Sequence, residues 1–161
     1  LIMKFSAQEE YGLRCLIRIA KAYRLGKAKT IPEISNEEEM SQHNVAKLLR
    51  VLRIGGFLES ERGHSGGYTL TIDPEEIKIS EVLNVLGGRL FDDSFCESHS
   101  GIPEICTHTV DCSTRSLWKI IQRAVDRVID NLTLNDLLGS ELFLFEKMDD
   151  KRVGLSSSSN N

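Results

Sequence analysis

Residues 41–72 read SQHNVAKLLRVLRIGGFLESERGHSGGYTLTI, and this segment joins a helix pattern to a hairpin pattern. Ser41 is a favourable N-cap, and Gly55-Gly56 is a suitable stop. Four apolar residues between them recur at the spacing of one buried helical face: Val45, Leu48, Leu49 and Leu52. Two strand-like runs, 57–62 and 68–72, then flank a glycine-rich turn. The segment therefore predicts a helix followed directly by a β-hairpin.

Two further helices are predicted upstream of this segment. An apolar stripe at helical spacing runs from the cap Ser6 to Leu25. A short helix begins after Thr30, where Pro32 and Glu33 complete a typical helix start, and it ends in an acidic run at 37–39. Two short helices with a brief break and a following hairpin are typical of a winged helix-turn-helix. The fold class predicted is mainly α with a small β-hairpin wing.

The remainder of the chain predicts a short helix at 79–86, a loop at 91–114 and a long helix at about 116–132. The long helix has an apolar band wider than a peripheral helix of a small domain needs, so we expect a homodimer seam there. The band comprises Leu117, Ile121, Ala124 and Val128 in one row, with Trp118, Val125, Ile129 and Leu132 beside it.

Three units are predicted from this pattern. Residues 3–75 form the winged helix-turn-helix domain, and 76–138 contain the cysteine loop and the long dimerisation helix. Residues 139–161 form a C-terminal extension with a flexible serine-rich tail.

Composition and charge limit the class of protein. The chain has 161 residues, of which 40% are hydrophobic, but it has no apolar run long enough to cross a bilayer and no recognisable signal peptide. A cytoplasmic protein without membrane attachment is therefore expected. The net charge of −4 divides into +3 over residues 1–72 and −7 over residues 73–161. We expect a polyanion such as double-stranded operator DNA to bind the N-terminal half.

The predicted DNA contacts lie on the exposed face of the 41–53 helix and at the tip of the hairpin. Hydroxyl and amide groups can donate to phosphates or base edges, cationic groups neutralise charge, and glycines let backbone approach a groove wall. A solvated helix face and an ordinary hairpin turn are the simpler alternatives. DNA binding is favoured because the hairpin directly follows the helix-turn-helix pattern, and the polar residues lie at the start of its second helix. The residues are Ser41, Gln42, His43, Lys47, Arg50, Arg62, His64, Ser65, Gly66 and Tyr68.

Three of the four cysteines cluster in the predicted loop: Cys96, Cys106 and Cys112. In a chain expected to be cytoplasmic, clustered thiolates are typical of an iron–sulfur cluster, and the spacing of these three does not match that of a zinc ribbon. Zinc bound by three cysteines and His99 or His108 is the competing interpretation. Cys15 lies near the apolar stripe of the first helix and is predicted to be buried. No catalytic constellation is recognisable, so an enzyme is not expected.

Over about residues 3–138 the sequence resembles the iron–sulfur winged-helix transcription regulators of the IscR/NsrR type. The matching parts are Met3–Ser6, Glu10–Arg14, the helix opening at Ser41-Gln42, the wing Arg62–Tyr68 and the three cysteines before a long helix. The resemblance implies a homodimer that binds a 2Fe-2S or 4Fe-4S cluster near the partner's first helix. It implies a transcription regulator that responds to iron, redox state or nitric oxide.

The sequence departs from this family at two points. The first gap between cysteines is longer than usual, and Arg115 stands where some members have a ligating histidine. Other members use a carboxylate donated by the partner subunit, and the corresponding residue here is Glu10. A helix-stabilising charge is the alternative role for Glu10. Other candidates for the fourth ligand are Glu9, Asp111, His99 and His108. Two alternatives to the cluster sensor are a thiol or zinc regulator of the same fold and a small electron-transfer protein.

Overall fold

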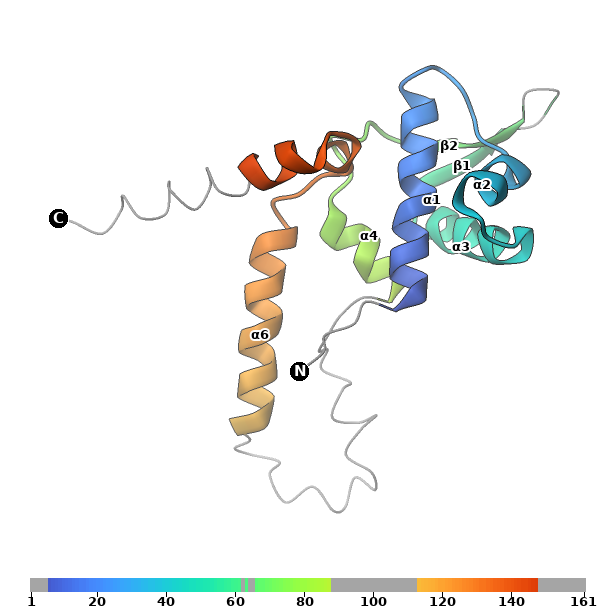
Figure 1. Cartoon of the computed structure of the whole chain (residues 1–161). Helices are drawn as coiled ribbons and strands as arrows, with labels where there is room; N and C mark the ends of the chain where they lie inside the picture. Colours follow the sequence, from blue (N-terminus) through green and yellow to red (C-terminus); the bar gives the residue numbers. More distant parts are fainter. Residues whose placement is uncertain (1–5, 62, 64–65, 88–112, 148–161) are drawn as a thin grey trace, which may run out of the picture.

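The computed structural model describes residues 6–61, 63, 66–87 and 113–147. Its first half contains the three predicted helices, α1 (Ala7–Tyr23), α2 (Ile31–Glu38) and α3 (Gln42–Ile54), which pack around a common core (Figure 1).

The predicted caps begin all three helices. The backbone N–H of Ser6 donates to Glu9 Oε2 at 2.7 Å, and the backbone N–H of Thr30 donates to Glu33 Oε2 at 2.7 Å. Ser41 Oγ accepts from the backbone N–H of Asn44 at 3.3 Å. Each contact satisfies an N–H that would otherwise lack a partner at a helix start.

The wing is an antiparallel hairpin of β1 (Leu58–Glu61) and β2 (Gly67–Leu70), in which Leu58 pairs with Leu70. Its base is joined to the α1–α2 connection through Lys29 and Tyr68: Tyr68 N–H donates to the Lys29 carbonyl at 2.7 Å, and Lys29 N–H donates to the Tyr68 carbonyl at 3.0 Å. A Cβ on Gly67 would lie 2.7 Å from the Lys29 carbonyl oxygen, so this close backbone approach requires glycine.

The second half adds α4 (Ile79–Leu86), α6 (Ser113–Ile129) and the 3₁₀ turn η2 (Leu134–Leu138), followed by a helix at 141–147. Helix α4 and η2 share the core of the winged unit, because buried side chains from both belong to the same hydrophobic cluster as α1 and α3. Helix α6 stands beside α4, and its N-terminal half extends beyond it (Figure 1). Within the described residues no helix is long and apolar enough to cross a membrane.

Helix α6 begins three residues earlier and ends three residues earlier than its apolar period predicts. The chain turns after Ile129, where Leu132 N–H donates to the Ile129 carbonyl at 3.1 Å. Leu132 still packs against the core, which is why the apolar period continues through it although the helix does not.

The turn η2 and the helix at 141–147 were not predicted, and they lie around the expected boundary at 138–139. The three-unit division stays a prediction. The expected cysteine loop, apart from residues 113 and 114 at the start of α6, and the serine-rich tail lie outside the described residues.

Candidate nucleic-acid interface

Helix α3 separates a buried face from a polar one. Val45, Leu49 and Leu52 are fully buried. On the opposite side, residues spaced by three or four positions form an exposed row: His43, Lys47, Arg50 and Ile54. Gln42 and Ser41 lie exposed at the start of the helix. The structure therefore places all five predicted contacts of this helix on the surface, as a DNA-reading helix requires.

The turn between α2 and α3 is held by backbone geometry and by Ser35. Glu39 adopts a left-handed conformation, with φ of 54°, that ends α2. The backbone N–H of Met40 then donates to the Ser35 carbonyl at 3.1 Å, while the Ser35 hydroxyl donates to the Met40 carbonyl. These contacts leave α3 one defined orientation relative to α2.

Glu38, the last residue of α2, is buried and joins this turn to α1. It accepts hydrogen bonds from Arg14 Nε, at 2.7 Å, and from Arg18 Nε. Burial alone would raise the pKa of the Glu38 carboxyl, but the hydrogen bonds and charges of Arg18 and Arg14 outweigh it and hold the pKa below its ordinary value. A charged Glu38 thus fastens the helix-turn-helix to the first helix.

Glu10 lies one turn before Arg14 on the exposed side of α1. Its side chain is 60% exposed, and Glu10 Oε1 lies 3.8 Å from Arg14 Nη1. At this distance, with both groups in solvent, the ion pair is weak. The Glu10 carboxylate can therefore exchange Arg14 for a partner that binds it more strongly.

The wing tip is described only in part, because Arg62, His64 and Ser65 lie outside the described residues. Gly66 lies in a tight turn, where a Cβ would approach the carbonyl oxygens of Glu61 and Gly63 to within 3.0 Å. Tyr68 is half-buried and packs against the core, so its backbone and ring anchor the base of the wing. Contacts from the wing to DNA stay predictions.

The three clustered cysteines also lie outside the described residues. Cys15 is fully buried, as predicted, and desolvation raises the pKa of its thiol to about 12. A thiol held neutral in this way is a core residue and not a reactive one. Among the residues that the structure describes, no group of three or more His, Cys, Asp or Glu side chains is arranged to hold a metal ion.

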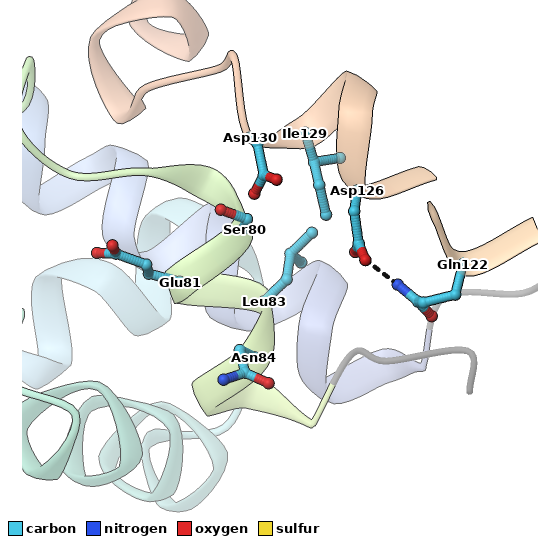
Figure 2. Close-up of a pocket in the computed structure, with 8 residues that line it drawn as sticks. All are labelled: Ser80, Glu81, Leu83, Asn84, Gln122, Asp126, Ile129 and Asp130. Carbon is cyan, nitrogen blue, oxygen red and sulfur yellow. Dashed lines mark hydrogen bonds between the residues drawn. The ribbon is translucent and has the colours of Figure 1, made fainter. Parts of the chain in front are cut away.

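A small cavity of about 210 Å³ lies between α4 and α6. Figure 2 shows Leu83 and Ile129 between the two helices, with Gln122 donating to Asp126 Oδ1 at 2.7 Å along α6. The cavity is lined by acidic and amide side chains as well, and it is a gap in helix packing that the sequence did not predict.

Two exposed residues of α3 were not among the predicted contacts. Asn44 lies three residues before Lys47, and Arg53 lies three residues after Arg50. Asparagine reads adenine edges, and arginine reads guanine or binds phosphate. The sequence carried a signal for both residues: each lies one helical turn from a predicted contact, and so on the same side of the helix.

Comparison with known proteins agrees with this geometry. The model of the Rrf2 family, described as iron-dependent transcriptional regulators, matches residues 5–140. The HTH-type transcriptional regulator CymR of Bacillus subtilis is 31% identical over 135 residues, which cover 84% of this chain and 89% of that protein. NsrR of the same organism is 31% identical over 138 residues, covering 84% and 90% of the two chains.

Solved structures give the same result. IscR of T. potens superposes with a TM-score of 0.67 at 26% identity, covering 84% of this chain and 86% of the other. The structure of B. subtilis CymR, described as the global cysteine regulator, superposes with a TM-score of 0.63 at 28% identity, covering 85% and 97%.

The chain therefore belongs to the Rrf2 family, and it is a DNA-binding transcriptional regulator with a winged helix-turn-helix fold. The predicted resemblance and fold class are confirmed, as is the expectation of a regulator instead of an enzyme.

Proposed function

We propose that this protein is a homodimeric, operator-binding regulator that senses iron, redox state or nitric oxide through an iron–sulfur cluster. Cys96, Cys106 and Cys112 supply three thiolates, the soft anionic ligands that such clusters need. The partner's Glu10 supplies the fourth ligand. When bound, the cluster supplies a redox-active and nitric-oxide-reactive centre of either 2Fe-2S or 4Fe-4S type.

The observation that carries the ligand assignment is the orientation of Glu10. Gln8 Nε2 donates to the Leu86 carbonyl at 2.9 Å, and a Cβ on Gly12 would clash with the Leu86 side chain. Gln8 and Gly12 therefore face the end of α4, where the chain leads into the cysteine segment. Glu10 is two residues from Gln8 and two from Gly12, which is about 200° around the helix, so it lies on the side of α1 opposite the end of α4. This favours donation to a second subunit over donation to its own cysteine segment.

The same helix gives a route from ligand to DNA. Glu10 pairs weakly with Arg14, and Arg14 holds Glu38 beside the turn that orients α3. If the cluster recruited the Glu10 carboxylate, the charge beside Arg14 would change. Binding or loss of the cluster would then alter how α1 holds Glu38 and the DNA-reading helix in both subunits, which is the differential interaction that a switch requires.

The visible absorption spectrum of anaerobically purified protein, with iron, sulfide and zinc contents, tests this proposal. We expect charge-transfer bands, iron and acid-labile sulfide in the purified dimer, and bleaching on exposure to nitric oxide or oxygen. A colourless protein without iron, purified with its thiols intact and not reconstituted by iron and sulfide, would contradict it.

A thiol or zinc regulator of the same fold is the second candidate. Its support is the similarity to CymR, whose structure is described as that of a global cysteine regulator. The same measurement separates the two: the second candidate gives no visible band, and it gives either stoichiometric zinc or DNA affinity that changes on thiol oxidation alone.

A further inference from the structure

A groove of about 290 Å³ runs between the first turns of α1 and the N-terminal half of α3. Its walls are formed by Ala7, Gln8, Tyr11, Asn44, Lys47 and Leu48. We propose that this groove holds one backbone phosphate of the bound duplex, with the Tyr11 hydroxyl and the Lys47 ammonium group as its ligands. The inference rests on the DNA-binding function of the family and assigns α1 a direct part in it.

The position of the groove fits this role. Lys47 belongs to the exposed row of α3, and Asn44 and Leu48 lie on the side of α3 that turns towards α1. A duplex read by the row therefore passes directly beside the groove. Phosphates flanking a recognition helix are the usual partners of groups on neighbouring helices, and they fix the register of docking.

The polar groups of the groove are suited to an anion. Lys47 is exposed and forms no ion pair with any residue that the structure describes. Tyr11 is 39% exposed, and its hydroxyl has no hydrogen-bond partner in the described part of the chain. Gln8 is already engaged through its amide to the Leu86 carbonyl, so it forms a wall. Of the described α1 side chains that line the groove, Tyr11 is then the one that offers a hydrogen-bond donor to an anion.

The charges around the groove favour a phosphate over a cation. The carboxylates of the α1 N-terminus do not line it: Glu9 caps the helix through Ser6, and Glu10 pairs with Arg14. The Arg14 guanidinium lies 5.8 Å from the centroid of the Tyr11 ring, but its charge is already paired with Glu38 and Glu10. Among the residues that line the groove, Lys47 therefore supplies the positive charge. A tyrosine hydroxyl donates one hydrogen bond to a phosphate oxygen, and lysine adds a point charge.

Ethylation interference with paired variants tests this inference. A duplex is first selected by the wild-type dimer from a random pool, and its phosphates are then ethylated one at a time. We expect Tyr11→Phe to weaken binding by about tenfold per half-site, the value of one hydrogen bond to a charged group. We also expect Tyr11→Phe to lose sensitivity at one phosphate in each half-site. Lys47→Gln should lose sensitivity at the same phosphate and lower the salt slope by about one per half-site.

Tyr23→Phe, which removes a hydroxyl at the other end of α1, and Lys21→Gln, which removes an exposed charge from that helix, are the matched controls and should bind as the wild type does. The inference is overturned if Tyr11→Phe, with unchanged thermal stability, keeps wild-type affinity or retains the full interference pattern. If the wild-type protein itself selects no duplex, the DNA-binding assignment fails instead. The two failures are therefore distinguishable.

Discussion

Glu38 shows at the level of one residue what tertiary structure adds to a sequence pattern. In the sequence it is the middle member of the run Glu37-Glu38-Glu39, which indicates only the exposed end of a short helix. In the structure it is buried and hydrogen-bonded by Arg14 and Arg18 of α1. No local pattern distinguishes it from its neighbours, because its partners lie 20 and 24 residues away.

Replacing Glu38 with Gln should destabilise the fold. The amide keeps the shape of the side chain but removes the charge that Arg14 and Arg18 bind, and it leaves their donors poorly matched. We expect the free energy of unfolding to fall by about 1–3 kcal/mol, since the arginines remain partly in water. Urea unfolding followed by circular dichroism measures the change. Glu39→Gln, which alters an exposed neighbour, is the control and should stay within about 0.5 kcal/mol of the wild type.

The contribution of Glu38 should depend on pH in a defined direction. Its pKa is lowered in the folded state, so its stabilisation is complete above its pKa in the unfolded state and is lost as the pH falls through the folded value. The difference in unfolding free energy between wild type and Glu38→Gln should therefore be full at pH 7 and shrink as the pH falls below about 5. Urea titrations across this range test it, and a difference independent of pH would exclude the charge as its cause.

Glu10 and the cysteines give a residue-scale test of cluster ligation. Under the proposed function Cys106→Ala removes a thiolate and should abolish the visible spectrum. Glu10→Ala should keep a cluster, because three thiolates remain, but that cluster should decay faster in air. The decay of the visible band in anaerobically prepared variants is the measurement. If Glu10→Ala leaves the spectrum, the lifetime and DNA binding unchanged, Glu10 is only a helix-stabilising charge.

At the level of elements, the caps and breaks of the first half were predictable and the later element ends were not. Thr30 and Ser41 start their helices through contacts within three residues, which the sequence encodes locally. The end of α6 is different. The chain leaves the helix to form the bridge between Thr133 and Lys78, while Leu132 keeps the apolar period intact. A break produced by pairing with a distant segment has no local signal.

The α3 row and the wing should contribute separately to DNA affinity. Arg50 is exposed in the row, and Arg62 is the predicted wing contact. Arg50→Ala and Arg62→Ala should each weaken binding and reduce the dependence of log Kobs on log salt by about one for each phosphate that the variant no longer neutralises. Fluorescence anisotropy over a salt series measures both quantities. Arg24→Ala, on the far end of α1, is the control, and an unchanged slope in both variants would contradict the docking proposed.

For the whole molecule, the candidate DNA-reading face was predictable because helical period alone separates it from the core. The way in which the elements of the second half pack together was not predictable from the sequence. Asp136 is buried in η2, where it accepts from Thr133 N–H at 2.9 Å and pairs with Lys147 of the helix at 141–147. Burial would raise the pKa of this carboxyl, but Lys147 and Thr133 hold it below its ordinary value. This ion pair depends on the folded arrangement of a 3₁₀ turn and a short helix, neither of which has a strong apolar period in the sequence.

Helix α6 gives the last prediction, which concerns assembly. Leu117 and Val128 of the predicted apolar band are exposed on α6, with Val128 43% exposed, and the neighbouring Ile120 is exposed too. The apolar band is therefore not used up by packing within the subunit. Val128→Glu should therefore leave the subunit folded, whereas at a dimer seam it places an unpaired charge against apolar surface. Ile121→Glu should act in the same direction, but Ile121 is half-buried within the subunit and a folding defect is harder to separate there. Sedimentation velocity should show a dimer for the wild type and for the control Arg123→Glu, on the polar side of α6, and a folded monomer for Val128→Glu. A stable Val128→Glu dimer would place the seam on another face of the subunit.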